Sequence, residues 1–184
     1  MFAPGQKKAI VIRVNAGPLP ADHWTVDPEI GGGRIVGEAC HFIDLASFLA
    51  GSPIVSVSAE AVDEGARDSV AIHLAFEDGG VASLNYLTNG NSGLAKEYIE
   101  IHGSGVSAVI NDFKNLTVWG ARRRTVRFRR QDKGHGEELR RFIESIEQGK
   151  PCPIPFEESF AATRATSLVL TSLRSGQRVM VDDA

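Results

Sequence analysis

Between residues 54 and 130 the sequence is a series of short segments in which apolar and polar residues alternate. The segments are "IVSVSAEAV", "DSVAIHLAFE", "GVASLNYLT", "KEYIEIHG", "VSAVIND", "LTVWG" and "RTVRFR", and turn signals such as "EDGG", "NGNSG" and "GSG" lie between most of them. Alternation with a period of two predicts strands, and short turns predict that neighbouring strands pair antiparallel. This part of the chain is therefore expected to form one large, mainly antiparallel sheet.

The flanking segments predict one more strand and three helices. The stretch "KKAIVIRVNA" is rich in β-branched residues and is expected to place Ile10, Ile12 and Val14 on one face and Arg13 and Asn15 on the other. Helical spacing of apolar residues predicts helices over residues 35–50, 135–150 and 156–177. The fold class is therefore α+β, a large open sheet with helices packed on one face, in a single domain spanning 1–184.

The helix predicted over residues 135–150 has a regular apolar face. Four residues follow the i, i+3, i+4, i+7 pattern of a helix that covers a core, namely Leu139, Phe142, Ile143 and Ile146. They are expected to point inward, and Gly149 is expected to end the helix.

Composition excludes several classes of protein. A formal charge of -3 gives no general attraction to nucleic acid or an anionic membrane, and the basic run at 122–130 alternates as one face of a strand would. Cys40 and Cys152 are too few for a disulfide framework or a CxxC metal site. No stretch approaches the roughly 20 apolar residues of a membrane span. We therefore expect a cytoplasmic protein that binds neither nucleic acid nor membrane.

The helix over residues 35–50 carries three ionisable residues at three-residue steps, Glu38, His41 and Asp44, among apolar neighbours. A helix with so many apolar residues is expected to be mostly buried. Charged side chains that are buried with it must either pair with other polar groups or belong to a functional site. Two alternatives remain open, a structural hydrogen bond between His41 and Asp44 and a working site next to the preceding "GGGR". A di-iron site would need a second Glu-x-x-His pair and two more glutamates, so no metal is predicted.

Polar and aromatic residues before this helix are candidates for binding a substrate. Asn15, His23 and Trp24 lie at the end of the first strand and in the Pro- and Gly-rich loop after it, and Arg34 begins the helix. A tryptophan face beside polar donors is a common way to hold a sugar ring, and an arginine binds carboxylate or phosphate. Trp24 is equally well explained as a cover for the loop.

Four segments of the chain, in order, resemble one known family. "RVNAGPLPADHW", "GGGRIVGEACHFIDLASFLAG", "KEYIEIHGSGVSAVINDF" and "GHGEELRRFIESIEQGKPCPIPFEESFAATRATSLVL" are similar to the C-terminal, substrate-binding domain of the Gfo/Idh/MocA oxidoreductases, related to glucose-fructose oxidoreductase and inositol dehydrogenase. The resemblance covers about residues 7–180 and implies a dihydrodipicolinate-reductase-like C-terminal domain that contributes the sugar or polyol pocket and the subunit interface.

The resemblance also implies a division of labour with a second domain. In the family an N-terminal Rossmann domain binds NAD or NADP beside a Glu-Lys-Pro lysine, and this sequence shows neither. By position His41 is the family's general acid or base, a task suited to a side chain that titrates near neutral pH. Gly37 stands where many members carry an aspartate, so Glu38 beside it is the candidate partner, and Asp44 fits the His-x-x-Asp pattern.

The resulting expectation is a substrate-binding domain of an NAD(P)-dependent sugar or polyol dehydrogenase. The isolated chain is expected to be inactive. It is also expected to form a homodimer or homotetramer through the open sheet, because the uncovered face of the sheet is expected to carry apolar residues. The alternative is a non-catalytic carbohydrate-binding or scaffold module that keeps the pocket without the chemistry.

Overall fold

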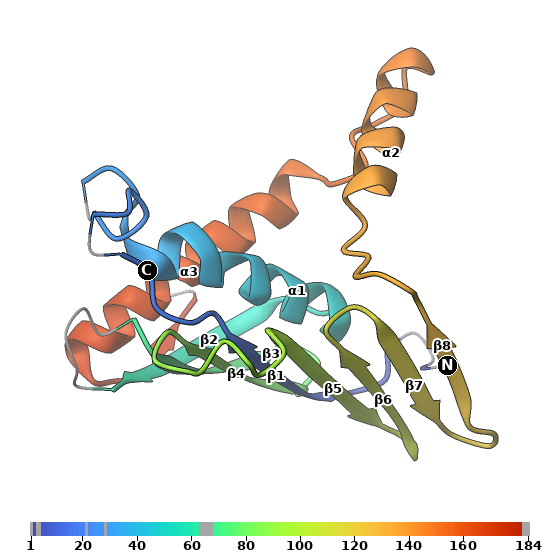
Figure 1. The fold of residues 1–184 in the computed structure, drawn as a ribbon, viewed down its shortest axis with the longest axis horizontal. Coiled ribbons are helices and arrows are strands. Elements are labelled where there is room, and N and C mark those ends of the chain that lie inside the picture. The colour runs from blue at the N-terminus through green and yellow to red at the C-terminus, as the bar shows by residue number, and fades with distance from the viewer. Residues whose placement is uncertain (1, 3–4, 21, 28, 63–67, 182–184) are drawn as a thin grey trace.

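A computed structural model describes residues 2, 5–20, 22–27, 29–62 and 68–181. In these ranges the strands form one open sheet in the order β8-β7-β6-β5-β1-β4-β3-β2-β9 (Figure 1). The strands are β1 (Ala9–Asn15), β2 (Ile54–Ala61), β3 (Val70–Phe76), β4 (Val81–Leu87), β5 (Glu97–Gly103), β6 (Val106–Asn111), β7 (Asn115–Trp119), β8 (Arg124–Arg127) and β9 (Val179–Met180). The predicted α+β fold with a large, mainly antiparallel sheet is confirmed.

The first strand of the chain lies in the middle of the sheet. β1 pairs parallel with β4 and antiparallel with β5, whereas the other neighbouring strands all pair antiparallel. Ile10, Ile12 and Val14 are at most 2% exposed, as the alternation predicts. This placement brings the end of β1 next to the end of β4 and the start of β5. The edge strand β9 escaped prediction because two residues carry no readable pattern.

Two helices cover one face of the sheet (Figure 1). A π-helical turn η1 (Ile35–Ala39) leads into α1 (Cys40–Ala50), and α3 (Phe156–Ser175) packs beside α1 and over β2. Ile43 and Ala46 of α1 and Val169 of α3 are fully buried. Within the described ranges, no helix combines the length and hydropathy that a membrane crossing requires.

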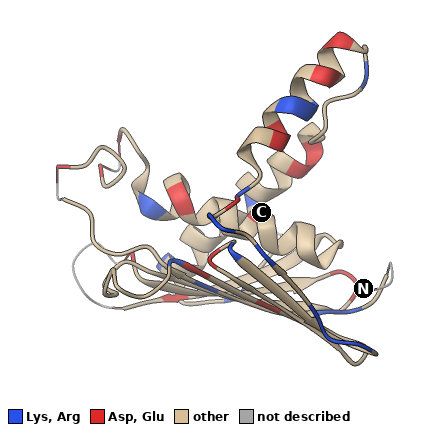
Figure 2. Cartoon of the chain, turned by 45° about the vertical axis from the view of Figure 1, so that its right-hand side comes forward, with Lys and Arg blue, Asp and Glu red and all other residues tan. Residues whose placement is uncertain are grey.

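The remaining helix, α2 (His135–Glu147), does not pack on the sheet. Figures 1 and 2 show it projecting away from the rest of the molecule. The prediction that its apolar residues point inward is therefore wrong, because 45–66% of each is exposed: Leu139, Phe142, Ile143 and Ile146. The spacing of apolar residues predicts that a helix has an apolar face, but it does not identify the surface against which that face packs. The predicted end is confirmed, since the helix stops before Gly149, which has a φ of 61°.

The opposite face of the sheet carries no helix and is more polar than expected. His102 contacts Ser107 at 2.9 Å and Glu100 at 3.2 Å, and the Tyr98 hydroxyl donates to Glu100 at 2.8 Å. Exposed apolar side chains such as Val81, at 52%, lie among these polar residues. The expectation of an apolar uncovered face is therefore only partly correct, because alternation sends the larger apolar side chains to the helix side.

Candidate active site

The first helical turn differs from an ordinary α-helix. The Cys40 N–H donates to the Ile35 carbonyl, a five-residue step that makes η1 a π-turn, a feature that often accompanies functional sites. A π-turn holds more residues per turn than an α-helix, so three-residue steps no longer keep side chains nearly in line. Glu38 consequently turns toward the sheet, whereas His41 and Asp44 are exposed on the outer side.

Gly37, at the position of the family's usual aspartate, packs tightly against the preceding loop. A Cβ at Gly37 would lie 2.8 Å from the Thr25 methyl carbon, and Thr25 is only 3% exposed. The loop therefore occupies the space that a side chain at this position would need. Glu38 does not take over that place beside His41, because among the described residues no hydrogen bond joins the two.

Glu38 is instead the centre of a polar cluster. Its carboxylate accepts a hydrogen bond from the Tyr86 hydroxyl at 2.7 Å and from the Arg34 Nε at 3.2 Å, and lies 3.8 Å from the Lys96 Nζ. Arg34 is 3% exposed and also donates to the Gly17 carbonyl at 2.6 Å. Its guanidinium carbon stands 5.5 Å from the centre of the Tyr86 ring. In this structure the Arg34 guanidinium donates its hydrogen bonds to Glu38 and to the Gly17 carbonyl. The binding of a substrate anion by Arg34 stays a prediction.

The electrostatics of the cluster keep Glu38 ionised. Burial raises the pKa of its carboxyl, but hydrogen bonds from Tyr86 and Arg34, with the charges of Arg34 and Lys96, outweigh burial and hold this pKa below its ordinary value of 4.5. Burial, and then the hydrogen bond to Glu38, raises the pKa of Tyr86. A group that exchanges protons near neutral pH needs a pKa close to that pH. Glu38 is thus better suited to hold Arg34, Lys96 and Tyr86 in place than to carry a proton.

His41 and Asp44 lie on the exposed outer face of α1. The expectation of a mostly buried helix is wrong here, because α1 buries only one side against the sheet and α3. The His41 Nδ1 stands 3.9 Å from the Cys40 sulfur, and no hydrogen bond joins His41 to Asp44 among the described residues. Partial burial, and then the negative charge of Glu158 on α3, raises the pKa of Asp44, whereas nearby His41 opposes the rise.

Asn15 fixes the loop that delivers Lys96 to this cluster. Its side-chain amide donates to the carbonyls of Asn91 at 2.7 Å and Leu94 at 3.0 Å, and it is 5% exposed. A Cβ on Gly90 would lie 1.8 Å from the Asn15 Oδ1, so a side chain at this position would displace the Asn15 amide. Asn15 therefore holds the loop between β4 and β5, and its predicted contact with a substrate stays a prediction.

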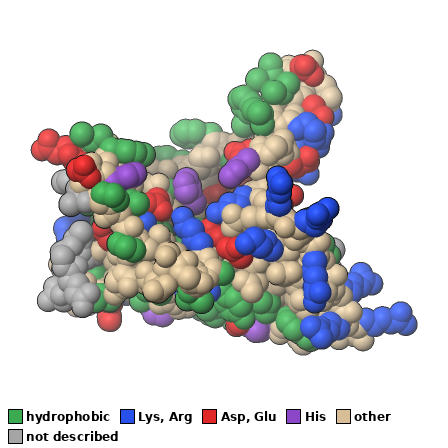
Figure 3. Space-filling model, in the orientation of Figure 1, with side chains coloured by type: hydrophobic (Ala, Val, Ile, Leu, Met, Phe, Trp, Pro, Cys, Tyr) green, Lys and Arg blue, Asp and Glu red, His purple; other side chains and the backbone are tan. Residues whose placement is uncertain are grey.

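A second buried carboxylate, Glu97, was not predicted. Glu97 and Tyr86 pair with Val14 from opposite sides, so all three point to the helix-covered face. The Glu97 side chain is 1% exposed and bonds Lys133 at 2.6 Å and Gln131 at 3.1 Å. The signal was readable, because a glutamate that alternates with two isoleucines on the buried face of a strand needs a partner. Figure 3 shows acidic, basic and histidine side chains gathered in the middle of this side of the molecule.

His23 and Trp24 form an exposed aromatic pair. Their ring centres are 5.9 Å apart with an angle of 28° between the planes, and the His23 Nδ1 accepts from the Thr25 N–H at 3.3 Å. Trp24 is 59% exposed, so it leaves most of its surface free. Among the described residues, no hydrogen bond connects this pair to His41 or to Glu38.

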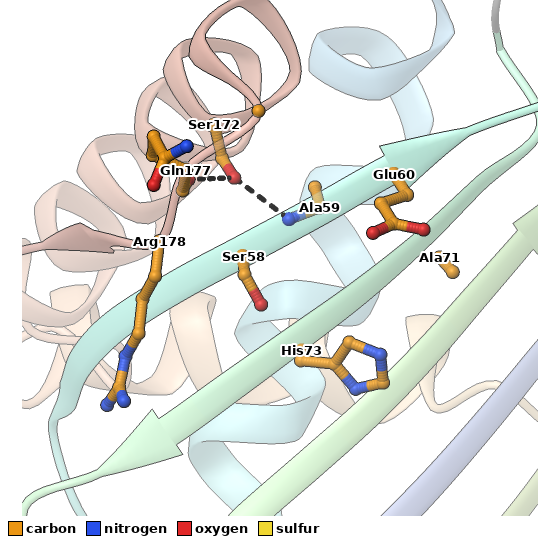
Figure 4. A pocket seen from close by; sticks show the side chains of 9 residues that line it. Ser58, Ala59, Glu60, Ala71, His73, Ser172, Gln177 and Arg178 are labelled. Carbon is orange, nitrogen blue, oxygen red and sulfur yellow. Dashed lines mark hydrogen bonds between the residues drawn. The ribbon is translucent and has the colours of Figure 1, made fainter.

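A hollow in the surface lies elsewhere, at the edge of the sheet. Figure 4 shows it between β2 and the end of α3, where Ser172 accepts from the Ala59 N–H and donates to the Gln177 carbonyl. It is lined by Ser58, Ala59, Glu60, Ala71, His73, Ser172, Gly176, Gln177 and Arg178. None of the predicted site residues lines it, so the fold places the predicted site and this hollow apart.

One glycine-rich stretch of the chain has the letters of a dinucleotide fingerprint. The glycine-rich stretch "HGSGVSA" forms the tight turn between antiparallel strands β5 and β6, whereas a dinucleotide fingerprint must open a helix. This confirms the interpretation of that stretch as a turn. Among the described residues, no group of three His, Cys, Asp or Glu side chains could hold a metal ion.

The sequence matches a known domain family. The profile of the GFO/IDH/MocA C-terminal domain matches residues 5–109, more than half of the chain. The chain belongs to the GFO/IDH/MocA family. This oxidoreductase family was expected from the four segments that resemble it, and the match includes the helix that carries Glu38 and His41. Among curated protein sequences none matches this chain.

Solved structures with the same fold include several oxidoreductases. Aldose-aldose oxidoreductase from Caulobacter crescentus is 16% identical with a TM-score of 0.79, over 96% of this chain and 56% of that one. An NAD binding oxidoreductase from Klebsiella pneumoniae is 17% identical with a TM-score of 0.79, over 97% and 59%. UDP-N-acetylglucosamine 3-dehydrogenase from Acidithiobacillus ferrooxidans is 16% identical with a TM-score of 0.77, over 94% and 55%. This chain thus spans little more than half the length of the structures that share its fold.

Proposed function

We propose that this chain is the substrate-binding domain of an NAD(P)-dependent dehydrogenase of a sugar or polyol, with His41 as its general acid or base. Family membership supports the oxidoreductase class, and similar structures include an aldose-aldose oxidoreductase and an NAD binding oxidoreductase. The observation that carries the proposal is the exposure of His41 on α1, three residues after Glu38 and its ordered cluster. In this arrangement an imidazole can reach a bound molecule without first leaving a core.

The proposed chemistry divides between this chain and another domain. NAD or NADP, held elsewhere, would accept the hydride that leaves a CH–OH carbon. His41 would take the proton of the same hydroxyl, so that the alcohol becomes a carbonyl, and would return a proton in the reverse direction. Glu38 would fix Arg34 and Tyr86. Lys96, which pairs with Glu38 and whose side chain is 43% exposed, is the cationic group of the cluster that is most open to solvent.

The exposure of His41 explains why the chain alone should not turn over substrate. Hydride transfer needs a site that excludes water and holds both reactants, whereas the outer face of α1 is open to solvent. A nucleotide-binding domain over this face would supply the missing wall and the cofactor.

The experiment compares two histidine variants in the enzyme assembled with its nucleotide-binding domain. His41→Ala should lower kcat by about a hundredfold or more, as expected for the loss of a general acid or base. His73→Ala, an exposed histidine on the opposite face of the sheet, should leave kcat unchanged. NAD(P)H absorbance follows the reaction. Full turnover by His41→Ala would remove this residue from the mechanism.

A non-catalytic carbohydrate-binding module is the second candidate, and the exposed Trp24 favours it. A bare indole stacked on His23 is a surface on which the apolar face of a sugar ring can lie. In that case Trp24→Ala would abolish sugar binding measured by calorimetry, whereas His41→Ala would leave both the affinity and any measured activity unchanged.

We also propose that the chain forms a homodimer or homotetramer through the open face of the sheet. Val81 and Trp119, 52% and 41% exposed, are apolar contacts available there, and the network of Tyr98, Glu100 and His102 supplies polar ones. Sedimentation of the protein as a monomer at micromolar concentration would contradict this assembly.

A further inference from the structure

Positive charge is concentrated in one short stretch at the edge of the sheet. The stretch "RRRTVRFRR", residues 122–130, holds six of the 20 lysines and arginines of a chain whose formal net charge is -3. The six are Arg122, Arg123, Arg124, Arg127, Arg129 and Arg130. All of them are exposed, and among the described residues none of them forms a salt bridge. Figure 3 shows basic side chains gathered at the end of the molecule where Figure 1 places β8.

The backbone of β8 has an open side. β8 is the last strand at one end of the sheet and, within the described sheet, pairs only with β7. The Phe128 N–H donates to the Lys114 carbonyl at 2.8 Å, at the end of this ladder. In an antiparallel pair, residues that bond the partner strand alternate with residues whose N–H and C=O groups point away from it. Thr125 and Arg127 therefore direct their backbone groups to the side of β8 that carries no strand.

Two arginines lie on either side of Thr125 on the open face of the sheet. The hydroxyls of Thr125 and Thr117 are 3.3 Å apart on this face, and Arg127 alternates onto the same face. The guanidinium carbon of Arg123 stands 5.5 Å from the centre of the Trp119 ring, which holds this side chain beside the edge. The edge thus combines free backbone donors and acceptors with cations at both ends.

We propose that the edge of β8 is a docking site for an extended acidic segment of another protein, which adds to the sheet as a further strand. Main-chain hydrogen bonds to Thr125 and Arg127 would give the segment its direction and register. Acidic side chains at every second position of the segment would face Arg123 and Arg127. The site is separate from the helix that carries His41 and does not depend on the dehydrogenase chemistry proposed above.

A peptide strand fits this edge better than a nucleic acid does. A strand has the same repeat as β8, about 3.3 Å per residue, so its side chains stay in step with the arginines. It also offers both donors and acceptors to the edge, whereas phosphate groups only accept hydrogen bonds. Binding of single strands relies on aromatic rings on which bases stack, and Arg123 already lies over the ring of Trp119.

A second copy of β8 does not fit the same edge. Residues 122–130 contain no Asp or Glu, so pairing β8 with β8 of another copy gives no arginine an acidic partner in any register. Like charges on facing strands are destabilising, and charged edges of this kind resist pairing with themselves. An acidic strand replaces this repulsion with attraction.

The test uses a synthetic peptide of alternating Glu and Thr, about ten residues long, which is enough to span β8 and its flanks. Calorimetry at low salt measures its binding to the 184-residue chain. The dissociation constant should rise at least about tenfold when Arg123→Ser and Arg127→Ser are combined, and also when Gln replaces every Glu of the peptide. The matched control combines Arg140→Ser and Arg141→Ser, two exposed arginines that pair only within α2, and should change it less than about twofold.

A second pair of variants tests the addition of a strand. Thr125→Pro removes the outward N–H without removing a bond to β7, and proline is tolerated at such edge positions. The dissociation constant should rise at least about fivefold in Thr125→Pro and stay within about twofold in Thr125→Val, which keeps the N–H. Hydrogen exchange of the unchanged chain gives an independent reading, because the bound peptide should protect the amides of Thr125 and Arg127.

Three results would overturn the proposal. Equal peptide binding by Thr125→Pro and Thr125→Val, with both amides unprotected, would leave attraction by charge without a strand. Peptide binding unaffected by Arg123→Ser and Arg127→Ser would place the contact elsewhere. A single-stranded oligonucleotide or phosphatidylserine vesicles that bind more tightly than the peptide at equal salt would assign the arginines to a different class of polyanion.

Discussion

Helices α1 and α2 are similar in length, at 11 and 13 residues, but they differ in how much of their apolar faces is buried. α1 buries Ile43 and Ala46 completely against the sheet and α3, whereas α2 leaves its apolar face, from Leu139 to Ile146, exposed to solvent. Both sequences have an apolar face at helical spacing, so the difference does not come from the helices themselves. It comes from the surface that the rest of the fold offers to each helix.

Hydrogen exchange should show the largest contrast between the two helices. The amides of Ile43 and Ala46 are expected to open only with the whole domain, whereas those of Phe142 and Ser145 open locally, so protection should differ by about a thousandfold or more. Exchange measured by NMR or mass spectrometry on the chain alone gives this comparison. Equal protection in α1 and α2 would show that α2 is already covered in solution.

Two isoleucine-to-alanine substitutions measure the same difference between α1 and α2 as a change in the free energy of unfolding. Ile43→Ala removes a fully buried side chain and should lower the free energy of unfolding by about 2–5 kcal/mol. Ile143→Ala removes a side chain that is 45% exposed and should cost less than about 1 kcal/mol. Urea unfolding followed by circular dichroism gives both values. A larger loss at Ile143 than at Ile43 would reverse the comparison.

Two tyrosines compare the covered side of the sheet with the open one. Tyr86→Phe removes a buried hydroxyl that donates to the ionised Glu38 and should cost about 2 kcal/mol. Tyr98→Phe removes the same kind of hydrogen bond, to Glu100, on the open face, and should cost less than about 0.5 kcal/mol. Equal losses would mean that the open face is as well shielded from water as the covered one.

Acid titration should reveal the smallest effect, at Glu38. The pKa of this carboxyl is lower in the folded chain than its ordinary value, so its ionisation stabilises the fold above that value and this contribution is lost as the pH falls through the folded pKa. The free energy of unfolding should therefore fall less below about pH 4.5 in Glu38→Gln than in the unchanged protein, and the difference should be less than about 1 kcal/mol. Urea unfolding from pH 6 to pH 3 measures it, with Glu147→Gln as an exposed control. An identical pH dependence in both variants would exclude a depressed pKa at Glu38.

The candidate site was only partly readable from the sequence. Glu38 and His41 were identified from their residue types and from the positions that they share with the family. The π-turn points their side chains in different directions, and the spacing of residue types does not predict such a turn. Asn15 and Arg34 were chosen as substrate contacts, whereas the structure shows them bound to Leu94 and Gly17 of this chain. Their partners lie far away in the sequence or in a loop without periodicity, so spacing could not reveal them.

The sequence by itself determined most of the elements of this protein. Alternation along β3 and β5, glycines that end α1 and α3, and an apolar face on each helix are local properties, because side-chain direction repeats along the chain. Only the tertiary structure decided which faces are covered. β1 lies between β4 and β5, α1 is half buried, and α2 is exposed, because coverage depends on contacts between segments that are distant in the sequence.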